Sequence, residues 1–588
     1  MIRRRTREYE SVRRWRRTAE TSEPQFYVAP VGPVPEGGAA ATGPSIPDVL
    51  HAQARVWGDL SGSVELVRYA FEGGDCAGVF DTLIEALPLA PTSFVHESFA
   101  SQLYLDELVK NCLVLRLPDR RITPNGKVLR RILETPPSDA AHCATRQRVL
   151  DELSKSPALR EDLTRVYLAL RRLRRALETA PAEEPNLVRR KVAILVALQS
   201  SVNAMADGFE GATSVLSRLR ERGLSVRATD GWARLTELVD LEGNIATVDV
   251  RLRLGSDGNI RGFGVLAVRE NADNHLLPGP FMRFIQRIVS FLRGYRYGES
   301  EVVVRLLEEV FAPFAEDVVA LLATTGAIEL YLVAFGFADL AKEKGLEVCL
   351  PEIVDAGADP AAPAERTIEG LFNPLLFLQG VTVRACDVPV GRHDALVVIT
   401  GPNSGGKTRF LQAVALTQLL GQVGIFVPAS RARLIRAPRL FLSLVTDVDV
   451  AQVEGRLGTE LFRIRQLFEQ IEPGSVAVLD ELCSGTNPME GESIFEMVLS
   501  LLPRLGPQLF VSTHFLGLAA RLERDRPVES LAFLQVELDP SERPTFKFVP
   551  GVATTSLAHK VAARLGVTRT ELEALVDAKL GKTRDPAT

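Results

Sequence analysis

Apolar residues recur with a helical period through most of the first 345 residues. Stretches such as Leu159 to Leu177 and Val188 to Leu219 combine an apolar face with a polar face that carries arginines, which predicts long amphipathic helices. Over 248–268 the apolar residues instead recur at every second position, in two runs that flank a Gly-Ser-Asp-Gly turn. This change predicts a β-hairpin inserted among helices, and helical spacing resumes from Phe281 to Leu340.

The second half of the chain shows a different pattern, in which short apolar runs alternate with helical segments. Ala395 to Thr400 has the length of a buried strand, and the helical spacing of Arg409 to Leu420 follows it after a glycine-rich loop. Two more apolar runs, Ser475 to Leu479 and Leu509 to Thr513, have strand character. We therefore expect a multidomain protein, with a mainly α-helical part containing a small β insertion followed by an α/β domain.

Stretches rich in proline, glycine and alanine indicate where the domains divide. One such stretch ends at Pro47 and follows a basic N-terminus, so residues 1–47 are expected to be a disordered tail and linker. A second, Asp355 to Pro363, separates the helical part from the α/β part. The predicted divisions are a helical region at 48–120, a second helical domain at 121–345, an α/β domain at 365–545 and a C-terminal segment at 546–588.

Composition and charge narrow the class of protein. The chain has 588 residues, a net charge of −5 and a pI of about 6.0, so any nucleic-acid contact must come from a local basic surface. The longest apolar region, Val318 to Ala338, is interrupted by Glu329, which favours buried helices over a membrane span. The six cysteines are scattered and form no C-x-x-C pair, so we expect reduced thiols and a cytoplasmic protein that does not contact a membrane.

The glycine-rich loop between the first strand and its helix matches the pattern G-x-x-x-x-G-K-[ST] in full. Its glycines let backbone N–H groups approach a polyphosphate, and the helix start adds positive potential. Lys407 is expected to reach the β- and γ-phosphates, and the Thr408 hydroxyl to bind Mg²⁺. The predicted ATP-binding residues are Gly401, Pro402, Asn403, Ser404, Gly405, Gly406, Lys407 and Thr408.

Two further strand ends supply candidate catalytic groups. The strand ending at Leu479 is followed by Asp480, expected to hold Mg²⁺, and by Glu481, expected to act as the general base toward water. The strand ending near Thr513 is followed by His514, which could sense the γ-phosphate. Taken singly, the Asp-Glu pair could be a surface strand end and His514 a core histidine.

In this order, the glycine loop, the Asp-Glu pair and the strand-end histidine resemble the ABC-type ATPases, in which two heads hold ATP between them. The particular residues of these motifs narrow the resemblance to the MutS family of DNA mismatch-repair ATPases. Thr400 to Ser430 (TGPNSGGKTRFLQAVALTQLLGQVGIFVPAS), Leu479 to Asn487 (LDELCSGTN) and Ser512 to His514 are similar to that family's nucleotide-site motifs. The resemblance implies ATP and Mg²⁺ as ligands, a homodimer through the ATPase heads, a helical lever domain over 121–345 and a dimerising C-terminal segment.

The sequence also departs from the family's pattern. The segment that in the family reaches the partner's γ-phosphate carries Ser-Thr-Phe, whereas here Gly458 replaces the serine, Thr459 is kept and Glu460 replaces the phenylalanine. Too few residues precede Ile122 for the family's mismatch-reading and connector domains, so we expect a short form in which the DNA-gripping clamp is reduced to the hairpin.

These features lead to two hypotheses about function. The first is a MutS-like ATPase whose hydrolysis is coupled to clamping mismatched, duplex or branched DNA in repair or recombination, with slow turnover because of the altered Gly458 segment. The alternative is an ATP-switched dimeric scaffold that grips protein or RNA without recognising mismatches. Clustering of the arginines and lysines of the helical arms on one concave surface would favour the first hypothesis, and scattered charges the second.

Overall fold

The computed structural model describes residues 46–579, apart from 56, 118–120, 181, 243–245, 255–259, 271–303, 305–306, 356–364, 445–455, 484–486 and 555–564. The predicted tail and linker therefore lie almost wholly outside the described residues, as does the predicted domain boundary at Asp355 to Pro363. The first part of the segment predicted to resume helical spacing at Phe281, residues 281–303 and 305–306, also lies outside them.

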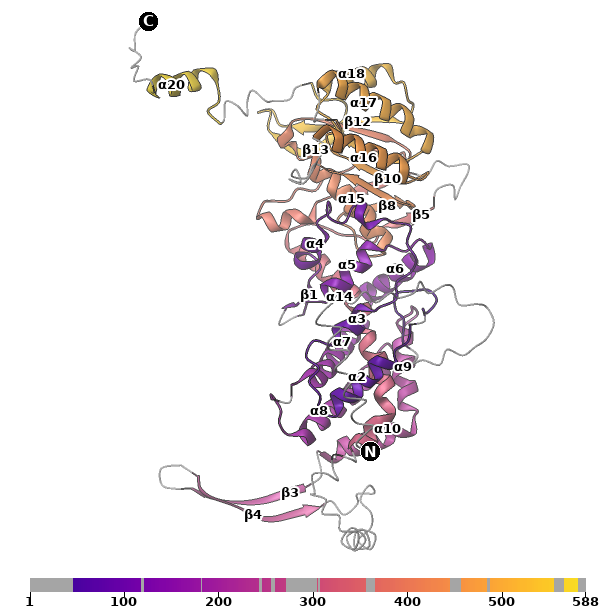
Figure 1. Cartoon of the computed structure of the whole chain (residues 1–588), viewed down its shortest axis with the longest axis vertical. Helices are drawn as coiled ribbons and strands as arrows, with labels where there is room; N and C mark the ends of the chain where they lie inside the picture. Colours follow the sequence, from indigo (N-terminus) through magenta and orange to yellow (C-terminus); the bar gives the residue numbers. More distant parts are fainter. Residues whose placement is uncertain are drawn as a thin grey trace, which may run out of the picture.

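The chain forms an elongated molecule with sheets toward one end and a long helical body extending from them (Figure 1). The helices of this body are α2 Ser61–Phe71, α3 Asp81–Glu85, η1 His96–Ser98, α4 Leu105–Asn111, α5 Gly126–Glu134, α6 Ala140–Lys155, α7 Pro157–Glu178, α8 Leu187–Asp207, α9 Ser217–Arg227, α10 Asp230–Glu242, η2 Ala312–Phe314, α13 Ala315–Ala323 and α14 Thr325–Glu343. A two-residue pair of strands, β1 Leu115–Arg116 and β2 Arg121–Ile122, lies beside α14. The first region, 48–120, is less helical than predicted, because turns separate its short helices.

The long helix predicted over Val188 to Leu219 is wrong, because the structure divides it. Helix α8 ends at Asp207 and α9 begins at Ser217. Between them Phe209 adopts a φ of 59° and Gly211 a φ of 75°, values that a right-handed helix cannot contain. Asp162 of α7 fixes the break, since its Oδ2 accepts a hydrogen bond from the Phe209 N–H at 2.9 Å.

The most apolar helices form the core of the body. The stretch Leu307–Glu343 is long and apolar enough to resemble a membrane span, but its most apolar window is completely buried inside the molecule. This agrees with the prediction of buried helices. The charged residue within it, Glu329, accepts hydrogen bonds from the Tyr167 hydroxyl and the Asn125 N–H, both at 2.8 Å. Burial raises the pKa of this carboxyl.

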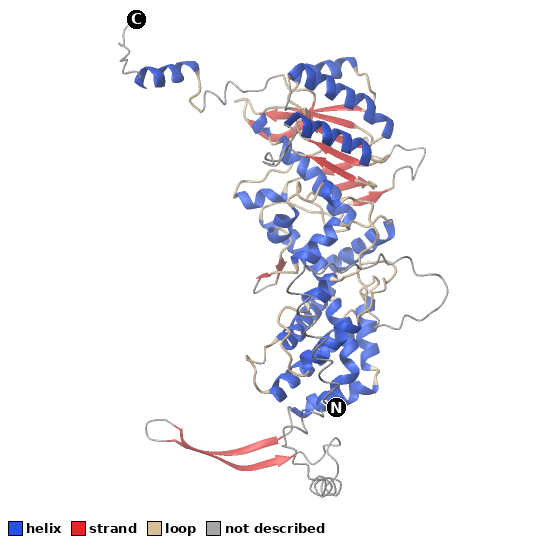
Figure 2. Ribbon diagram, viewed as in Figure 1, coloured by secondary structure: helices blue, strands red, loops and turns tan. Residues whose placement is uncertain are grey.

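The predicted hairpin is confirmed. Strands β3 Ala246–Leu254 and β4 Ile260–Glu270 pair antiparallel, with Val248 opposite Val268. The hairpin projects from the end of the body that lies farthest from the large sheet (Figure 2).

The large sheet has six strands in the order β13-β12-β7-β11-β10-β9. Their bounds are β7 Leu396–Thr400, β9 Leu440–Ser443, β10 Val476–Leu479, β11 Gln508–Ser512, β12 Leu531–Leu538 and β13 Pro544–Pro550. All neighbouring pairs are parallel except β12 with β13. The α/β prediction is thus confirmed as a mainly parallel sheet, and the predicted division at residue 546 falls inside β13.

Helices cover both faces of this sheet. Helix α15 Lys407–Val423 packs on one face and shares the core of the helical body. The other face carries a separate core with α16 Arg456–Gln470, α17 Pro488–Leu501 and α18 Leu516–Asp525. Alternating residues of each strand contribute to the two cores: Val397 and Ile399 to the first, and Leu396 and Val398 to the second.

Smaller elements complete the fold. A three-stranded sheet in the order β5-β8-β6 consists of β5 Glu352–Val354, β8 Arg431–Ile435 and β6 Thr367–Glu369, and the short turns are η3 Pro374–Gln379, η4 Asn403–Gly405 and η5 Leu502–Leu505. Helix α20 Arg569–Lys579 buries none of its residues and stands away from the sheet (Figure 1). Its apolar residues Leu572, Leu575 and Val576 follow a helical spacing and are exposed.

Candidate nucleotide site

The predicted site residues come together because three parallel strands end at one edge of the sheet. Strand β11 lies between β7 and β10, and Leu479 is in register with Val511. The next residues along these strands are therefore neighbours at the carboxyl edge, where open α/β sheets place their ligand sites. The glycine loop after Thr400, the Asp480–Glu481 pair and the Thr513–His514 pair all follow these strand ends.

The glycine loop has a backbone that other residues could not adopt at two positions. Gly401 has a φ of 135° and Gly406 a φ of 85°, both in the region that favours glycine. Space is also limited, because a Cβ on Gly401 would lie 2.7 Å from the Val536 side chain, and one on Gly405 would lie 2.8 Å from it. Helix α15 begins at Lys407, so the loop presents its N–H groups at a helix start, as predicted.

The Lys407 side chain folds back into the loop that precedes it. Its Nζ donates to the carbonyl oxygens of Gly401 at 2.9 Å and Pro402 at 3.3 Å and lies 3.5 Å from the Asn403 Oδ1. Burial lowers the pKa of this ammonium, while the nearby charges of Glu481 and Asp480 oppose that shift. Lys407 is therefore a buried cation beside both predicted acidic groups, where it could bind phosphate oxygens.

Thr408 and Asp480 are in direct contact. The Thr408 hydroxyl donates to the Asp480 Oδ2 at 2.5 Å, which joins the start of α15 to the end of β10. Asp480 is 6% exposed, so its carboxylate is held in place with little access to solvent. A hydroxyl and a carboxylate are the hard oxygen ligands that Mg²⁺ prefers, and Mg²⁺ takes few protein ligands when phosphates supply others. Among the described residues, no group of three or more His, Cys, Asp or Glu side chains could hold a metal ion.

Ser512, which the sequence analysis placed in the histidine motif without a role of its own, contacts both acidic residues. Its hydroxyl donates to the Asp480 Oδ1 and accepts the Glu481 N–H at 2.9 Å, so it orients both acidic residues. Glu481 itself has a φ of 47°, an unusual conformation for a residue other than glycine. The sequence signals for Ser512 were its position at the end of an apolar strand and its place in the motif Ser512 to His514, neither of which indicated its contacts with Asp480 and Glu481.

The remaining predicted residues are His514 and two residues at the start of α16. His514 has an exposed side chain whose ring centroid lies 4.2 Å from that of Phe515. Gly458 and Thr459 are in the first turn of α16, on the face of the sheet opposite to α15. The structure thus brings together Lys407, Thr408 and Asp480, with Glu481 adjacent.

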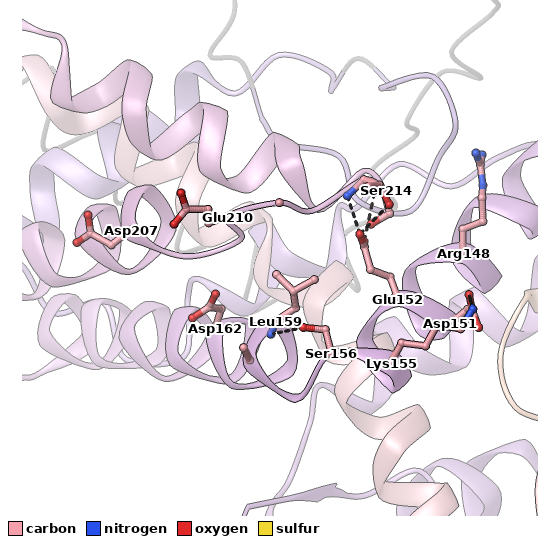
Figure 3. Close-up of a pocket in the computed structure, with 13 residues that line it drawn as sticks. Arg148, Asp151, Glu152, Lys155, Ser156, Leu159, Asp162, Asp207, Glu210 and Ser214 are labelled. Atoms are coloured by element: carbon pink, nitrogen blue, oxygen red, sulfur yellow. Dashed lines mark hydrogen bonds and ion pairs between the residues drawn. The ribbon is translucent and has the colours of Figure 1, made fainter.

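A separate hollow of about 710 Å³ lies in the helical body, between α6, α7 and the α8–α9 connection (Figure 3). Carboxylates predominate in its lining, which includes Asp151, Glu152, Asp162, Asp207 and Glu210 against Arg148 and Lys155. Several of these carboxylates already bind the chain, as Glu152 does when it accepts the Thr213 N–H at 2.6 Å. This hollow has the wrong charge for nucleic-acid phosphates.

Comparison with known proteins agrees with this geometry. Residues 397–576 match the family model described as MutS domain V, a range that contains the glycine loop, Asp480, Glu481 and the strand ending before His514. Over this range, which includes the mainly parallel sheet and the site at its carboxyl edge, the chain is similar to the MutS family.

Several relatives bear the name Endonuclease MutS2. The chain is 29% identical to the protein of Thermomicrobium roseum over 46% of its own length and 34% of the relative's. It is 28% identical to the protein of Thermus thermophilus over 52% of its own length and 38% of the relative's. It is 24% identical to the protein of Lactiplantibacillus plantarum over 66% of its own length and 50% of the relative's. The chain therefore spans half or less of the length of these relatives.

Proposed function

We propose that this protein is a Mg²⁺-dependent ATPase of MutS type that acts as a homodimer and couples ATP hydrolysis to gripping DNA. The observation that carries the ATPase proposal is the direct contact between Thr408 and Asp480 beside the buried Lys407. Within this proposal, Lys407 and the loop N–H groups bind the β- and γ-phosphates. Mg²⁺ held by Thr408 and Asp480 neutralises charge that develops on the phosphates.

The other predicted site residues act on the attacking water, on the γ-phosphate or across the contact between subunits. Glu481 accepts a proton from the attacking water, and His514 contacts the γ-phosphate. Gly458 and Thr459 act from the partner subunit, as the resemblance to the family's segment implies. The exposed apolar residues of α20 support a second contact between subunits, because an unpartnered amphipathic helix gains stability when a partner covers it.

The ATPase proposal is tested with Lys407→Ala. We expect loss of ATP binding by fluorescence anisotropy of a labelled ATP analogue, because the variant removes the only charge that the loop contributes to the phosphates. Arg431→Ala, which removes an exposed cation of β8 that pairs with Glu369, is the control and should keep most of the affinity. Equal ATP affinity of Lys407→Ala and the wild type would contradict the proposal.

The DNA part of the proposal is supported by the projecting hairpin and by exposed arginines on α7. Arg172 and Arg175 are exposed, and no ion pair is found for either among the described residues. The test is binding of duplex, mismatched and four-way-junction DNA across a salt series, with and without ATP. A variant in which a Gly-Ser turn replaces residues 246–270 should bind DNA at least about tenfold more weakly. If the wild type binds no DNA at low salt in either nucleotide state, the DNA proposal fails.

A second candidate function is an ATP-switched scaffold that grips a protein or RNA in the cytoplasm without recognising mismatches. The observation that favours it is that several other arginines on the helical body are paired with carboxylates. The pairs are Arg160–Asp339, Arg165–Asp162, Arg174–Glu178, Arg222–Asp317 and Arg227–Asp207. Paired arginines contribute little attraction for phosphates, so retained RNA or protein binding without DNA binding in the assay above would support this function.

A further inference from the structure

The edge strand of the large sheet, β9, is covered by a segment of the helical body, residues 93–102. The Ser93 hydroxyl donates to the Pro438 carbonyl at 2.5 Å, and the Ser98 hydroxyl to the Leu440 carbonyl at 2.8 Å. The Gln102 amide continues this series, because its Nε2 donates to the Leu442 carbonyl at 2.9 Å. Side chains thus satisfy every second carbonyl along an edge that would otherwise be unpaired.

Gln102 makes more contacts with the strand than the two serines do. Its Oε1 also accepts the Leu444 N–H at 2.6 Å, so the amide holds the strand on both sides of Ser443. The Ser443 carbonyl points the other way and accepts the Asp480 N–H at 2.8 Å. The part of β9 that Gln102 holds is therefore joined to the backbone of Asp480 by a single hydrogen bond, the one that the Ser443 carbonyl accepts.

Gln102 is also tied to the helix that carries Thr408. Its backbone carbonyl accepts a hydrogen bond from the Gln412 Nε2 at 3.2 Å. Gln412 lies four residues after Thr408 on α15, hence on the same face of that helix. It is 3% exposed, and its Oε1 is held by the Arg409 Nη1 at 2.8 Å.

A closed series of contacts results. Gln102 holds β9 through its side chain and α15 through its backbone, while Thr408 and Asp480 join α15 to β10 at 2.5 Å. The distance between the two candidate Mg²⁺ ligands thus depends on a residue of the helical body that touches neither of them. We infer that Gln102 is a positioning residue for the Thr408–Asp480 pair, through which the helical body adjusts Mg²⁺-dependent nucleotide binding.

This inference rests on the proposed ATPase function, and it gives a specific expectation. Gln102→Leu keeps the approximate size of the side chain but removes both amide contacts with β9. The affinity for a labelled ATP analogue is measured in Mg²⁺ and in EDTA, and the ratio of the two affinities is compared among variants. We expect the ratio to fall about tenfold, as is typical when a group supporting a metal ligand is removed.

Two controls separate positioning from a general loss of packing. Ser98→Ala removes a contact with the same strand, and Gln147→Leu removes another glutamine contact between the body and the sheet region, the 2.7 Å bond to the Pro351 carbonyl. Neither should change the ratio. Amide hydrogen exchange of the nucleotide-free protein provides a second readout, in which peptides covering 440–444 and 476–481 should lose protection only in the Gln102 variant.

Gln102→Glu is tested beside Gln102→Leu. The carboxylate keeps an acceptor for the Leu444 N–H but has no donor for the Leu442 carbonyl, so the ratio should fall here too. If Gln102→Leu does not fold, the result for Gln102→Glu decides. An unchanged ratio with unchanged exchange, or an equal change in Gln147→Leu, overturns the inference. Failure of the wild type to bind ATP would instead overturn the proposed function.

Discussion

At the scale of single residues, the backbone geometry of the glycine loop could be predicted, because it depends on neighbours in sequence. Gly401 and Gly406 occupy backbone conformations that their residue type alone suggests, and Lys407 and Thr408 stand at fixed offsets from them. Ser512 could not be predicted, because its role depends on β11 lying beside β10 in a particular register. The left-handed backbone of Glu481 likewise leaves no sign in the sequence.

The assignment of Glu481 as general base leads to a prediction. Glu481→Gln keeps the size of the side chain and removes its basicity, so ATP should bind normally while kcat falls by about 10²- to 10⁴-fold. Binding of the labelled analogue and steady-state phosphate release are the measurements. Glu496→Gln, a half-exposed glutamate of α17 paired with Arg521, is the control and should not change kcat. Wild-type turnover by Glu481→Gln would show that another group activates water.

Ser512→Ala tests the role in orienting Asp480 and Glu481 that the sequence did not predict for this residue. The variant leaves the Asp480 Oδ1 without its hydroxyl donor and the Glu481 N–H without its acceptor. Hydrogen bonds to charged groups contribute about 1.5–3 kcal/mol, so ATP affinity in Mg²⁺ should fall about tenfold or more. Ser500→Ala removes an exposed serine that bonds the Met497 carbonyl, and should have no effect. Equal affinities of the two variants would mean that Asp480 is oriented without Ser512.

At the scale of elements, apolar periodicity predicted the kinds of element better than their ends. The hairpin and the parallel strands were identified because each has a continuous pattern of its own. The helix predicted through 188–219 failed because its break is imposed from outside, by Asp162 of α7 binding the backbone at Phe209. A periodic sequence does not reveal a competing contact from a distant helix.

The buried carboxylate of α14 gives a prediction about pH. Burial raises the pKa of Glu329 in the folded protein above its ordinary value of 4.5. For a carboxyl whose pKa is raised, the associated stability is present below the unfolded pKa and is lost as pH rises through the folded pKa. Glu329→Gln has no such charge, so its thermal stability relative to the wild type should increase as pH rises from 5 to 8.

Differential scanning calorimetry of both proteins at several pH values measures this difference. Glu329→Ala is the contrasting variant, because it leaves the Tyr167 hydroxyl and the Asn125 N–H without their acceptor. It should destabilise the protein by about 1–3 kcal/mol at every pH. A pH-independent difference between Glu329→Gln and the wild type would show that the carboxyl stays charged throughout this range.

At the scale of the whole molecule, the sequence indicated that a helical body precedes an α/β domain, but it did not indicate which arginines of the helices pair with carboxylates. The first hypothesis had the arginines of the amphipathic helices contact DNA phosphates. In the structure some of them instead form ion pairs, such as Arg222–Asp317, that join helices far apart in sequence. Pairing of this kind depends on tertiary packing, which periodicity does not describe. Gln102 is a similar case, because its contacts with β9 and α15 cross more than 300 residues of chain.

The altered segment at the start of α16 allows the dimer itself to be tested. Gly458 lies in the first turn of this helix, where a serine would add a hydroxyl without disturbing the helix. If this turn completes the partner's nucleotide site, Gly458→Ser should raise kcat about tenfold, since a donor placed at developing charge accelerates the reaction. Gly458→Ala changes the backbone in the same way but adds no hydroxyl, so it should leave kcat near the wild-type value.

Mixing subunits shows whether the new serine acts at the nucleotide site of its own subunit or at that of the partner subunit. A chain with both Gly458→Ser and Lys407→Ala cannot use its own site, but it can offer the new hydroxyl to a wild-type partner. Adding this chain to wild-type protein should therefore raise phosphate release above that of the wild type alone. The double variant of Gly458→Ala with Lys407→Ala should lower it or leave it unchanged. Stimulation by both double variants, or by neither, would place Gly458 outside the partner's site.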